Sequence, residues 1–333
     1  MGDLNYPVKA ITAQIPEQKT FESKPFPLVL SPDTNSKDAN APEVCSWAKE
    51  NQSTLKQQLL DHGAILFRNF KISSPEDFDS FVKSFDLAPF PYIGGAAPRR
   101  VITGNVFTAN ESPPSEPIPF HHEMAQVPDF PKVLFFYCNI PPTEGGQTPI
   151  AHSNMVYQRM QDRAPDLVRR LEDEGVRYIR TLPDEDDPNS PIGRSWKSTY
   201  LTQEKSEAEA RAKEQGTTIE WLPNGCLKTT TKVLPAIRID ERTGKKTWFN
   251  SVIAAYLGWQ DSRNDRKTAV SFANGEFMQE TEMETLRATL DESAVDFPWQ
   301  KGDVLMVDNR QALHARRTFT PPRQILACLC KDS

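Results

Sequence analysis

The residue types that could do chemistry in this chain are two histidines and a glutamate, which lie far apart in the sequence. His121 and Glu123 stand two positions apart in the segment Phe-His-His-Glu-Met at residues 120–124, and His314 follows much later. Two imidazoles and one carboxylate form the ligand set that holds non-haem Fe(II) on one face and leaves the opposite face open. If the three side chains meet in space, the sequence predicts an oxygen-activating iron enzyme.

The pair His121 and Glu123 is weak support when taken alone. With five histidines and 45 acidic residues in the chain, a His-x-acid pair arises by chance. On an extended strand, however, residues i and i+2 point to the same face. His121 and Glu123 could therefore bind one ion together, and His122 is expected to point away. A ligand role for His122 in place of His121 stays open.

The downstream sequence strengthens the interpretation of His314 as a metal ligand. Gly302 and Asp303 precede an apolar run, His314 follows soon after that run ends, and Arg323 leads into the last apolar run. Arginine is a natural partner for a carboxylate, because its planar guanidinium binds two oxygens at once. A histidine followed by such an arginine, in a chain that also carries His-x-Glu, favours a metal centre over a structural role.

Short strands must position these residues. Apolar runs typical of strands lie at 64–70, 133–138, 236–239, 246–249, 304–307 and 325–329. Helical patterns cover 44–62, a segment that begins at Ser74, 155–174 and 280–291. The strands bracket the helices instead of alternating with them regularly. This order favours a mainly β fold, a sandwich or barrel with flanking helices, over a doubly wound parallel sheet.

The organisation along the chain suggests one large domain. Residues 1–43 are rich in Pro, Ser, Asp and Asn and are expected to form an extended N-terminal arm with one strand. Residues 44–333 are expected to form a single domain. The polar segment 183–225 is predicted to be a helical insertion in that domain, with a charged helix at 202–215.

Composition excludes several classes of protein. The 39 basic and 45 acidic residues give a net charge of -6, which argues against a nucleic-acid partner. The chain has no apolar run near the roughly 18 residues needed to cross a bilayer. It also has no signal-peptide pattern at its beginning. Five cysteines without metal-type spacing indicate reduced thiols, so we expect a cytoplasmic protein with no membrane partner.

Several segments, taken together, resemble the taurine dioxygenase family, and most of all its clavaminate-synthase-like branch. The similarity covers roughly residues 50–330, with the motifs in the family's order. The segments that carry it are Phe-His-His-Glu-Met at 120–124, Glu-Gly-Gly-Gln-Thr at 144–148, Trp-Phe-Asn at 248–250, the stretch from Gly302-Asp303 to Asn309-Arg310, and His314 to Arg317 before Pro322-Arg323.

The resemblance implies a double-stranded β-helix, or jelly roll, with Fe(II) as cofactor and 2-oxoglutarate and O2 as co-substrates. It implies that His121, Glu123 and His314 are the catalytic iron ligands. Thr148 and Arg323 would bind the distal carboxylate of 2-oxoglutarate. The family often has a second arginine at the next position, where this chain has Gln324. The expected reaction is oxidation, by hydroxylation, of an unidentified small molecule.

Two other functions remain open at this point. One is a non-catalytic jelly-roll protein that binds metal. The other is a metal-dependent hydrolase, for example with zinc, that uses the same two histidines and glutamate. Thr148 and Arg323 argue against the hydrolase, because the resemblance assigns them to a keto acid.

Five further residues have roles that the sequence does not decide. Arg316 and Arg317 could face an anionic substrate or lie on the surface. Asn250 could border the substrate pocket or close the end of a strand. His152 could support the metal ligands, whereas His62 is expected to be structural, because a helix C-terminus favours an imidazole there.

Overall fold

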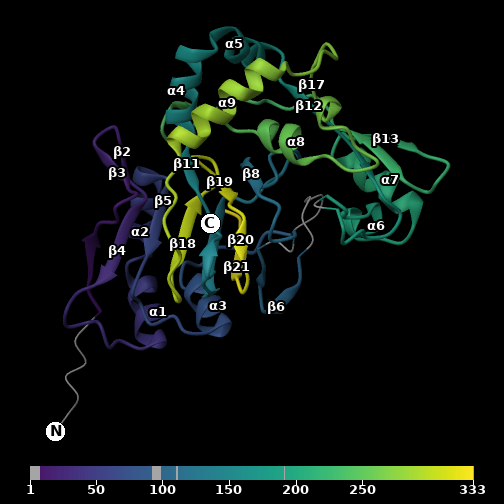
Figure 1. The fold of residues 1–333 in the computed structure, drawn as a ribbon. Helices are drawn as coiled ribbons and strands as arrows, with labels where there is room; N and C mark the ends of the chain where they lie inside the picture. The colour runs from purple at the N-terminus through teal and green to yellow at the C-terminus, as the bar shows by residue number, and fades with distance from the viewer. Residues whose placement is uncertain (1–7, 92–98, 110–111, 191, 333) are drawn as a thin grey trace.

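The computed structural model describes residues 8–91, 99–109, 112–190 and 192–332 (Figure 1). Strands form the centre of the molecule, and helices lie on both sides of them. In Figure 1, α1 to α3 lie at the lower end, α4, α5, α8 and α9 cover the upper end, and α6 and α7 project to one side. The fold is sheet-rich with flanking helices, as the sequence predicts.

The main sheet is apolar on both faces. Its strand order is β1 (Ala10–Ala13), β4 (Leu28–Pro32), β5 (Ala64–Phe67), β18 (Val304–Asp308), β9 (Val133–Ile140), β21 (Gln324–Cys330), β7 (Val106–Thr108) and β6 (Val101–Thr103). Neighbouring strands run antiparallel except β4 and β5. The first six residues of β9 are all buried, because layers cover both sides of it. This explains why its sequence is continuously apolar rather than alternating.

The N-terminal arm contains more strands than the sequence indicates. Besides β1 and β4, it forms the hairpin of β2 (Lys19–Phe21) and β3 (Lys24–Phe26). β4 pairs in parallel with β5, so the arm extends the main sheet. Only the strand at β4 has the apolar pattern that the sequence analysis used. The other strands form because their backbones pair with neighbours, which leaves no strong local signal.

Helices α1 (Ala41–Glu50), α2 (Gln52–His62) and α3 (Pro75–Lys83) cover one face of the main sheet. The sequence predicts a single helix over 44–62, but the structure divides it at Asn51. The Asn51 side chain donates a hydrogen bond to the Trp47 carbonyl and ends α1. The predicted start at Ser74 is confirmed, because its hydroxyl accepts a hydrogen bond from the Asp77 N–H.

A smaller sheet packs on the other face of the main sheet. Its strand order is β11 (Ile150–His152), β19 (Ala312–Arg316) and β8 (Ile118–His121). Ile150 and Ala312 from this sheet share an apolar layer with Leu134 and Phe136 of the main sheet. The functional residues identified from the sequence lie at the edge of this layer. Short strands β10 (Glu144–Gly145) and β20 (Phe319–Thr320) pair beside it.

The outer side of the smaller sheet is covered by α4 (Ser153–Arg163), α5 (Pro165–Asp173), α8 (Val252–Gly258) and α9 (Glu280–Ser293). The sequence predicts one helix over 155–174, and this is wrong in one respect. The helix breaks at Ala164, because Pro165 lacks an N–H and disfavours helical geometry in the residue before it. The predicted helix at 280–291 corresponds to α9.

The segment after β12 (Val176–Leu182) projects from the sheets. It contains α6 (Trp196–Tyr200), α7 (Lys205–Glu214), β13 (Thr218–Trp221) and β14 (Leu227–Thr230). β12 and β14 join β13 and β17 (Val270–Phe272) in a sheet of order β13-β14-β12-β17. The charged helix expected at 202–215 corresponds to α7. We call residues 183–225, the segment predicted from the sequence, the insertion.

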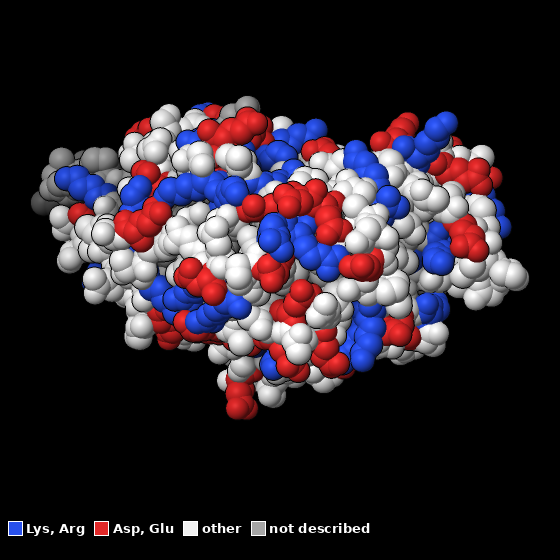
Figure 2. All heavy atoms as spheres, turned by 90° about the horizontal axis from the view of Figure 1, so that it is seen from above, with Lys and Arg blue, Asp and Glu red and all other residues white. Residues whose placement is uncertain are grey.

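The remaining elements are the pair β15 (Arg238–Asp240) and β16 (Lys245–Thr247) and the short 3-10 helix Arg266–Thr268. In the described part of the chain, no helix is both long and apolar enough to cross a membrane. Basic and acidic side chains are interspersed over the face shown in Figure 2, without a continuous basic stripe. This surface agrees with the near balance of charges in the sequence.

Candidate active site

Two neighbouring strands bring His121 and His314 together. β8 pairs antiparallel with β19, and His121 lies directly opposite His314 in this pairing. Their rings stand 4.3 Å apart between centroids. The ring of Phe136, from the main sheet, packs 5.1 Å from His314. Two histidines almost two hundred positions apart in the chain therefore become cross-strand neighbours.

Glu123 reaches the same place from a turn. β8 ends at His121, so Glu123 lies just beyond the strand and not on it. The turn is fixed by Asn309, whose side-chain carbonyl accepts a hydrogen bond of 2.8 Å from the Glu123 N–H. The Asn309 amide donates one of 3.0 Å to the Glu123 carbonyl. The turn continues through Met124, which has a left-handed backbone with φ of 58°.

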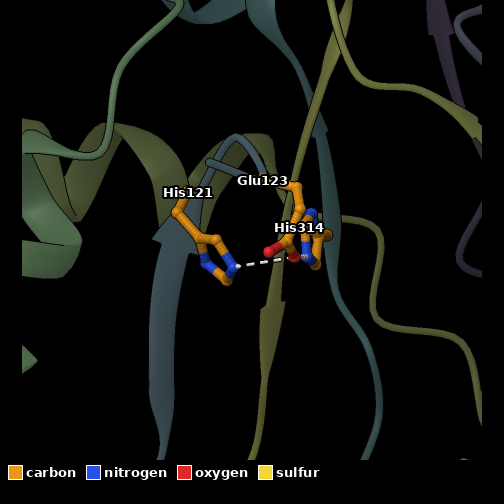
Figure 3. A group of neighbouring side chains, drawn as sticks. All are labelled: His121, Glu123 and His314. Atoms are coloured by element: carbon orange, nitrogen blue, oxygen red, sulfur yellow. Dashed lines mark ion pairs between the residues drawn. The ribbon is translucent and has the colours of Figure 1, made fainter. Parts of the chain in front are cut away.

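The three predicted ligands converge at one point (Figure 3). One ligand atom from each of His121, Glu123 and His314 lies within 4.8 Å of the others. Glu123 Oε2 is 3.6 Å from His314 Nε2 and 4.0 Å from His121 Nε2. Ligands of a first-row metal ion stand about 2 Å from it, and therefore roughly 3 Å from one another. The two separations from the Glu123 oxygen exceed that spacing by about 1 Å or less, so small side-chain movements would bring the set onto one ion.

The protonation states of these groups suit metal binding. Burial, with a contribution from His314, lowers the pKa of His121 to about 4, so its imidazole is neutral at pH 7. Burial alone would raise the pKa of Glu123. That effect is the largest single one, but the charge of Arg99 and the two imidazoles together outweigh it and hold the Glu123 pKa well below its usual range. A neutral imidazole and an ionised carboxylate are the forms that coordinate metal.

Arg99 is a site residue that the sequence analysis missed. Its guanidinium donates a hydrogen bond of 2.9 Å to Glu123 Oε2, and both side chains are 6% exposed. The oxygen that accepts this bond is the one that faces the two imidazoles. No motif marks Arg99, because its position depends on the path of the chain between α3 and β6.

His122 lies outside the ligand set, as predicted. Its Nδ1–H donates a hydrogen bond of 2.6 Å to the Asn309 carbonyl, and Nε2 accepts one of 2.5 Å from the Ser153 hydroxyl. Its ring packs on Phe249 at 4.5 Å. Both ring nitrogens are thereby used. The open alternative, in which His122 replaces His121, is not supported by this geometry.

Thr148 and Arg323 form a second polar group in the same cavity. The Arg323 guanidinium donates to Thr148 Oγ1 over 3.3 Å and to the Gly146 carbonyl over 2.8 Å. Gly146 has φ of 67°, and a Cβ there would lie 2.9 Å from Arg323 Cδ. Glycine at this turn therefore permits the close approach of Arg323. Gln324 instead bonds Asn139, so Arg323 is the residue that faces the cavity.

Trp299 was also missed by the sequence analysis. Its indole N–H donates a hydrogen bond of 3.1 Å to Thr148 Oγ1. With Arg323 as a second donor, the Thr148 oxygen accepts two hydrogen bonds, which leaves its own hydrogen free to point at a ligand. Trp299 stands three residues before Gly302, where the sequence motif at Gly302-Asp303 begins. Its closeness to that motif was a signal that could have identified it.

One cavity of about 140 Å³ unites these groups. Its lining includes the three predicted metal ligands together with Thr148 and Arg323. Its other walls are mostly apolar, and they include Ile118, Met124, Ala254 and Trp259. The cavity also contains Arg99 and Arg316.

The residues that the sequence left undecided have varied positions. Arg316 is buried and donates to the carbonyls of Ser112, Pro113 and Glu116, so it orders the loop beside the cavity. Arg317 makes ion pairs with Asp291 and Asp296 on the surface.

The other undecided residues serve structural roles. The Asn250 amide donates to the Ala236 carbonyl and so joins two segments that are separated in sequence. His152 packs against Phe21 and Phe26, away from the metal ligands. The His62 Nδ1–H donates to the Pro25 carbonyl.

Solved structures share this fold. PvcB, described as an Fe, α-ketoglutarate dependent oxygenase from an isonitrile synthetic pathway, superposes with a TM-score of 0.52 at 14% identity. The match covers 99% of this chain and 93% of that one. This likeness shows a shared sheet-rich fold, on which this chain carries a His-Glu-His set of the kind that holds non-haem Fe(II).

The family follows from sequence similarity. Residues 23–329 match the taurine catabolism dioxygenase TauD, TfdA family, and the chain belongs to this family. It is 49% identical over 324 residues to a clavaminate synthase-like protein of Arabidopsis thaliana, covering 96% of this chain and 98% of the relative. It is also 26% identical over 282 residues to the dapdiamide synthesis protein DdaC of Enterobacter agglomerans, covering 81% and 83% of the two chains.

Proposed function

We propose that this protein oxidises a small molecule by hydroxylating a C–H bond, with consumption of 2-oxoglutarate and O2. His121, Glu123 and His314 would bind Fe(II). Thr148 and Arg323 would bind the distal carboxylate of 2-oxoglutarate. The observation that carries this proposal is that both groups line one cavity.

The protein's own residues prepare the site in this proposal. Burial keeps His121 neutral, and Arg99 together with the two imidazoles keeps Glu123 ionised, so both are ready to coordinate. When bound, the iron supplies the chemistry of O2 activation, which draws electrons from the keto acid as it loses CO2. The apolar walls exclude water around the reacting bond and hold the substrate near the metal.

The charge around Arg323 supports a carboxylate ligand there. Burial, with the nearby charge of Arg316, lowers the pKa of Arg323 to about 9, which still leaves it cationic at pH 7. Among the described residues that line the cavity, Glu123 is the only acid. An anionic co-substrate would supply the missing counter-charge. This favours a keto-acid oxygenase over a hydrolase that uses the same three ligands.

We also propose that the two facing sheets form the double-stranded β-helix of this class. Residues 44–333 would form one domain with the arm 1–43 attached, and the insertion would be its accessory part. The shared apolar layer of the two sheets supports one folding unit. We place the protein in the cytoplasm, since its buried cysteines are unpaired among the described residues.

The test is to add Fe(II) and 2-oxoglutarate to the purified protein, first without O2 and then with it. We expect 2-oxoglutarate binding in the calorimeter and succinate formation after O2 is admitted. His121→Ala should abolish both metal binding and succinate formation, whereas His62→Asn, at a distant histidine, should change neither. A wild-type protein that binds neither iron nor 2-oxoglutarate would overturn the proposal.

A further inference from the structure

A second cavity of about 50 Å³ adjoins the one that contains the metal ligands. Gln126 and Trp259 line both cavities, so the two are neighbours across these side chains. The lining of the smaller cavity is rich in hydroxyl and amide groups, in contrast to the apolar walls of the larger one. We call this smaller cavity the polar annexe.

The insertion supplies one wall of the polar annexe. Thr199 and Tyr200 come from α6, which packs on α7 within the insertion. The Thr199 side chain is buried, and its Oγ1 has no hydrogen-bond partner among the residues that the structure describes. A buried hydroxyl without a partner is costly unless a ligand or water satisfies it. This group therefore points to a ligand that can accept a hydrogen bond.

Tyr200 offers a second hydrogen-bond donor. Burial raises the pKa of Tyr200 to about 12, although the charge of Arg180 acts in the opposite direction. The phenol is therefore protonated at pH 7, and the Arg180 cation lies near it. Arg180 is held by its bond of 2.6 Å to the Ile192 carbonyl, and its guanidinium carbon stands 5.6 Å from the Trp259 ring centre.

The charge of the combined cavities also favours an anion. Among the described residues that line either cavity, four arginines face a single acid, Glu123; the arginines are Arg99, Arg180, Arg316 and Arg323. Fe(II) and the dianion of 2-oxoglutarate carry opposite charges of equal size and so do not change this balance. A bound anionic substrate would reduce the excess of positive charge, whereas a cationic substrate would add to it.

We infer that the substrate is a small carboxylic acid whose carboxylate lies in the polar annexe, bound by Thr199, Tyr200 and Arg180. Its apolar body would pass between Gln126 and Trp259 and present a C–H bond to the metal beside Met124. This inference rests on the proposed function and adds the substrate class. It gives the insertion a role, because α6 supplies two of the three groups that would bind the carboxylate.

The test uses full-length protein loaded with Fe(II) and 2-oxoglutarate under anaerobic conditions. Calorimetry compares straight-chain and aryl-substituted carboxylic acids, each paired with its own primary amide. We expect the preferred acid to bind about tenfold more tightly than its amide, because hydrogen bonds to a charged group are stronger than those to a neutral one. No acid binding, or equal binding of acid and amide, would overturn the inference.

Two conservative variants locate the carboxylate. Thr199→Val and Tyr200→Phe each remove one hydroxyl, and each should weaken binding of the acid about tenfold. Thr218→Val is the matched control, because Thr218 is exposed on β13 and should leave acid binding unchanged. Melting temperatures verify that the variants fold. If both cavity variants bind the acid as well as wild type does, the assignment of the annexe is wrong.

The outcome also separates this inference from the proposed function. If wild type binds 2-oxoglutarate and forms succinate but does not distinguish acids from amides, the oxygenase proposal stands and the substrate class is wrong. If wild type binds no 2-oxoglutarate, the proposed function itself fails.

Discussion

Among the described residues that line the larger cavity, Glu123 carries the only negative charge, and Arg99, Arg316 and Arg323 line the same cavity. Arg99 donates a hydrogen bond to Glu123 Oε2, while Arg323 stands beside Thr148. These two arginines serve different purposes: Arg99 compensates a protein carboxylate, and Arg323 is free to compensate one that arrives with a ligand. Residues of one type thus acquire distinct roles from their neighbours.

Arg323→Gln should reduce 2-oxoglutarate affinity by about 100-fold, because loss of a buried charge that pairs with a carboxylate costs about 3 kcal/mol. Arg317→Gln removes an arginine that follows β19 and pairs with Asp291 and Asp296 on the surface, and it should leave the affinity unchanged. Calorimetry with 2-oxoglutarate measures both variants. Equal affinities in the two variants would contradict the role given to Arg323.

Trp299→Phe should weaken 2-oxoglutarate binding about fivefold without changing iron affinity, because one neutral hydrogen bond to Thr148 contributes about 1 kcal/mol. The phenyl ring keeps most of the packing. Trp47→Phe is the matched control, since Trp47 stacks on Phe70 away from the cavity. A loss of iron binding in Trp299→Phe would indicate general damage to the site instead.

At the scale of elements, the site depends on contacts between segments that are distant in sequence. The pairing of β8 with β19 sets His121 opposite His314. Asn309, just after β18, then fixes the turn that carries Glu123. Its amide also donates to the Pro131 carbonyl over 2.7 Å. One buried amide therefore joins the end of β18 to the turn after β8 and to the start of β9.

Asn309→Ala should lower the free energy of unfolding by about 3 kcal/mol, because three buried hydrogen bonds at about 1 kcal/mol each are lost. Iron affinity should fall as well, since the turn at Glu123 loosens. Urea unfolding of metal-free protein gives the first quantity and metal titration the second. Asn189→Ala, at an exposed asparagine, is the control. A variant as stable as wild type would show that Asn309 does not hold this turn.

At the scale of the whole molecule, the sheets and the insertion meet around the cavities, and the N-terminal arm packs beside them. The smaller sheet and the turn after β8 supply the proposed metal ligands, the insertion supplies α6, and the N-terminal arm attaches at the main sheet. The arm also reaches the smaller sheet, because Phe21 and Phe26 cover His152 at the end of β11. His152 is thus a probe of how firmly the arm is docked.

The buried His152 predicts a loss of stability in acid. Burial, with the charge of Lys245, lowers the pKa of His152 to about 4, against 6.5 in the unfolded chain. As the pH falls from 6.5 to about 4, the unfolded state takes up a proton that the folded state excludes. Stability should therefore fall by about 3 kcal/mol from this group.

His152→Phe should reduce the slope of the unfolding free energy against pH in this window by the contribution of one proton. Urea unfolding of metal-free protein between pH 4 and about 7 measures it. Wild type and His152→Phe share all the other histidines, so their difference in slope is due to His152. An unchanged slope would mean that His152 is protonated in the folded state.

Strands and helix boundaries could be predicted where residues adjacent in the sequence determine them. Apolar runs marked β9 and β18, and Ser74 marked the start of α3. The breaks at Asn51 and Pro165 were also local signals, but the helical periodicity on either side obscured them. Strand β1 was not predictable, because it forms by pairing with β4, and the short hairpin of β2 and β3 has no apolar run to mark it.

The sequence by itself determined the types of the site residues, their order and the chemistry they could perform. The tertiary structure decided that β8 and β19 align His121 with His314, that Glu123 reaches them from a turn, and that Arg99 joins them. The physical reason is the distance along the sequence over which each property acts. Side-chain chemistry and periodicity are properties of short segments, whereas an ion pair or a shared cavity depends on where the backbone carries residues that are remote in the chain.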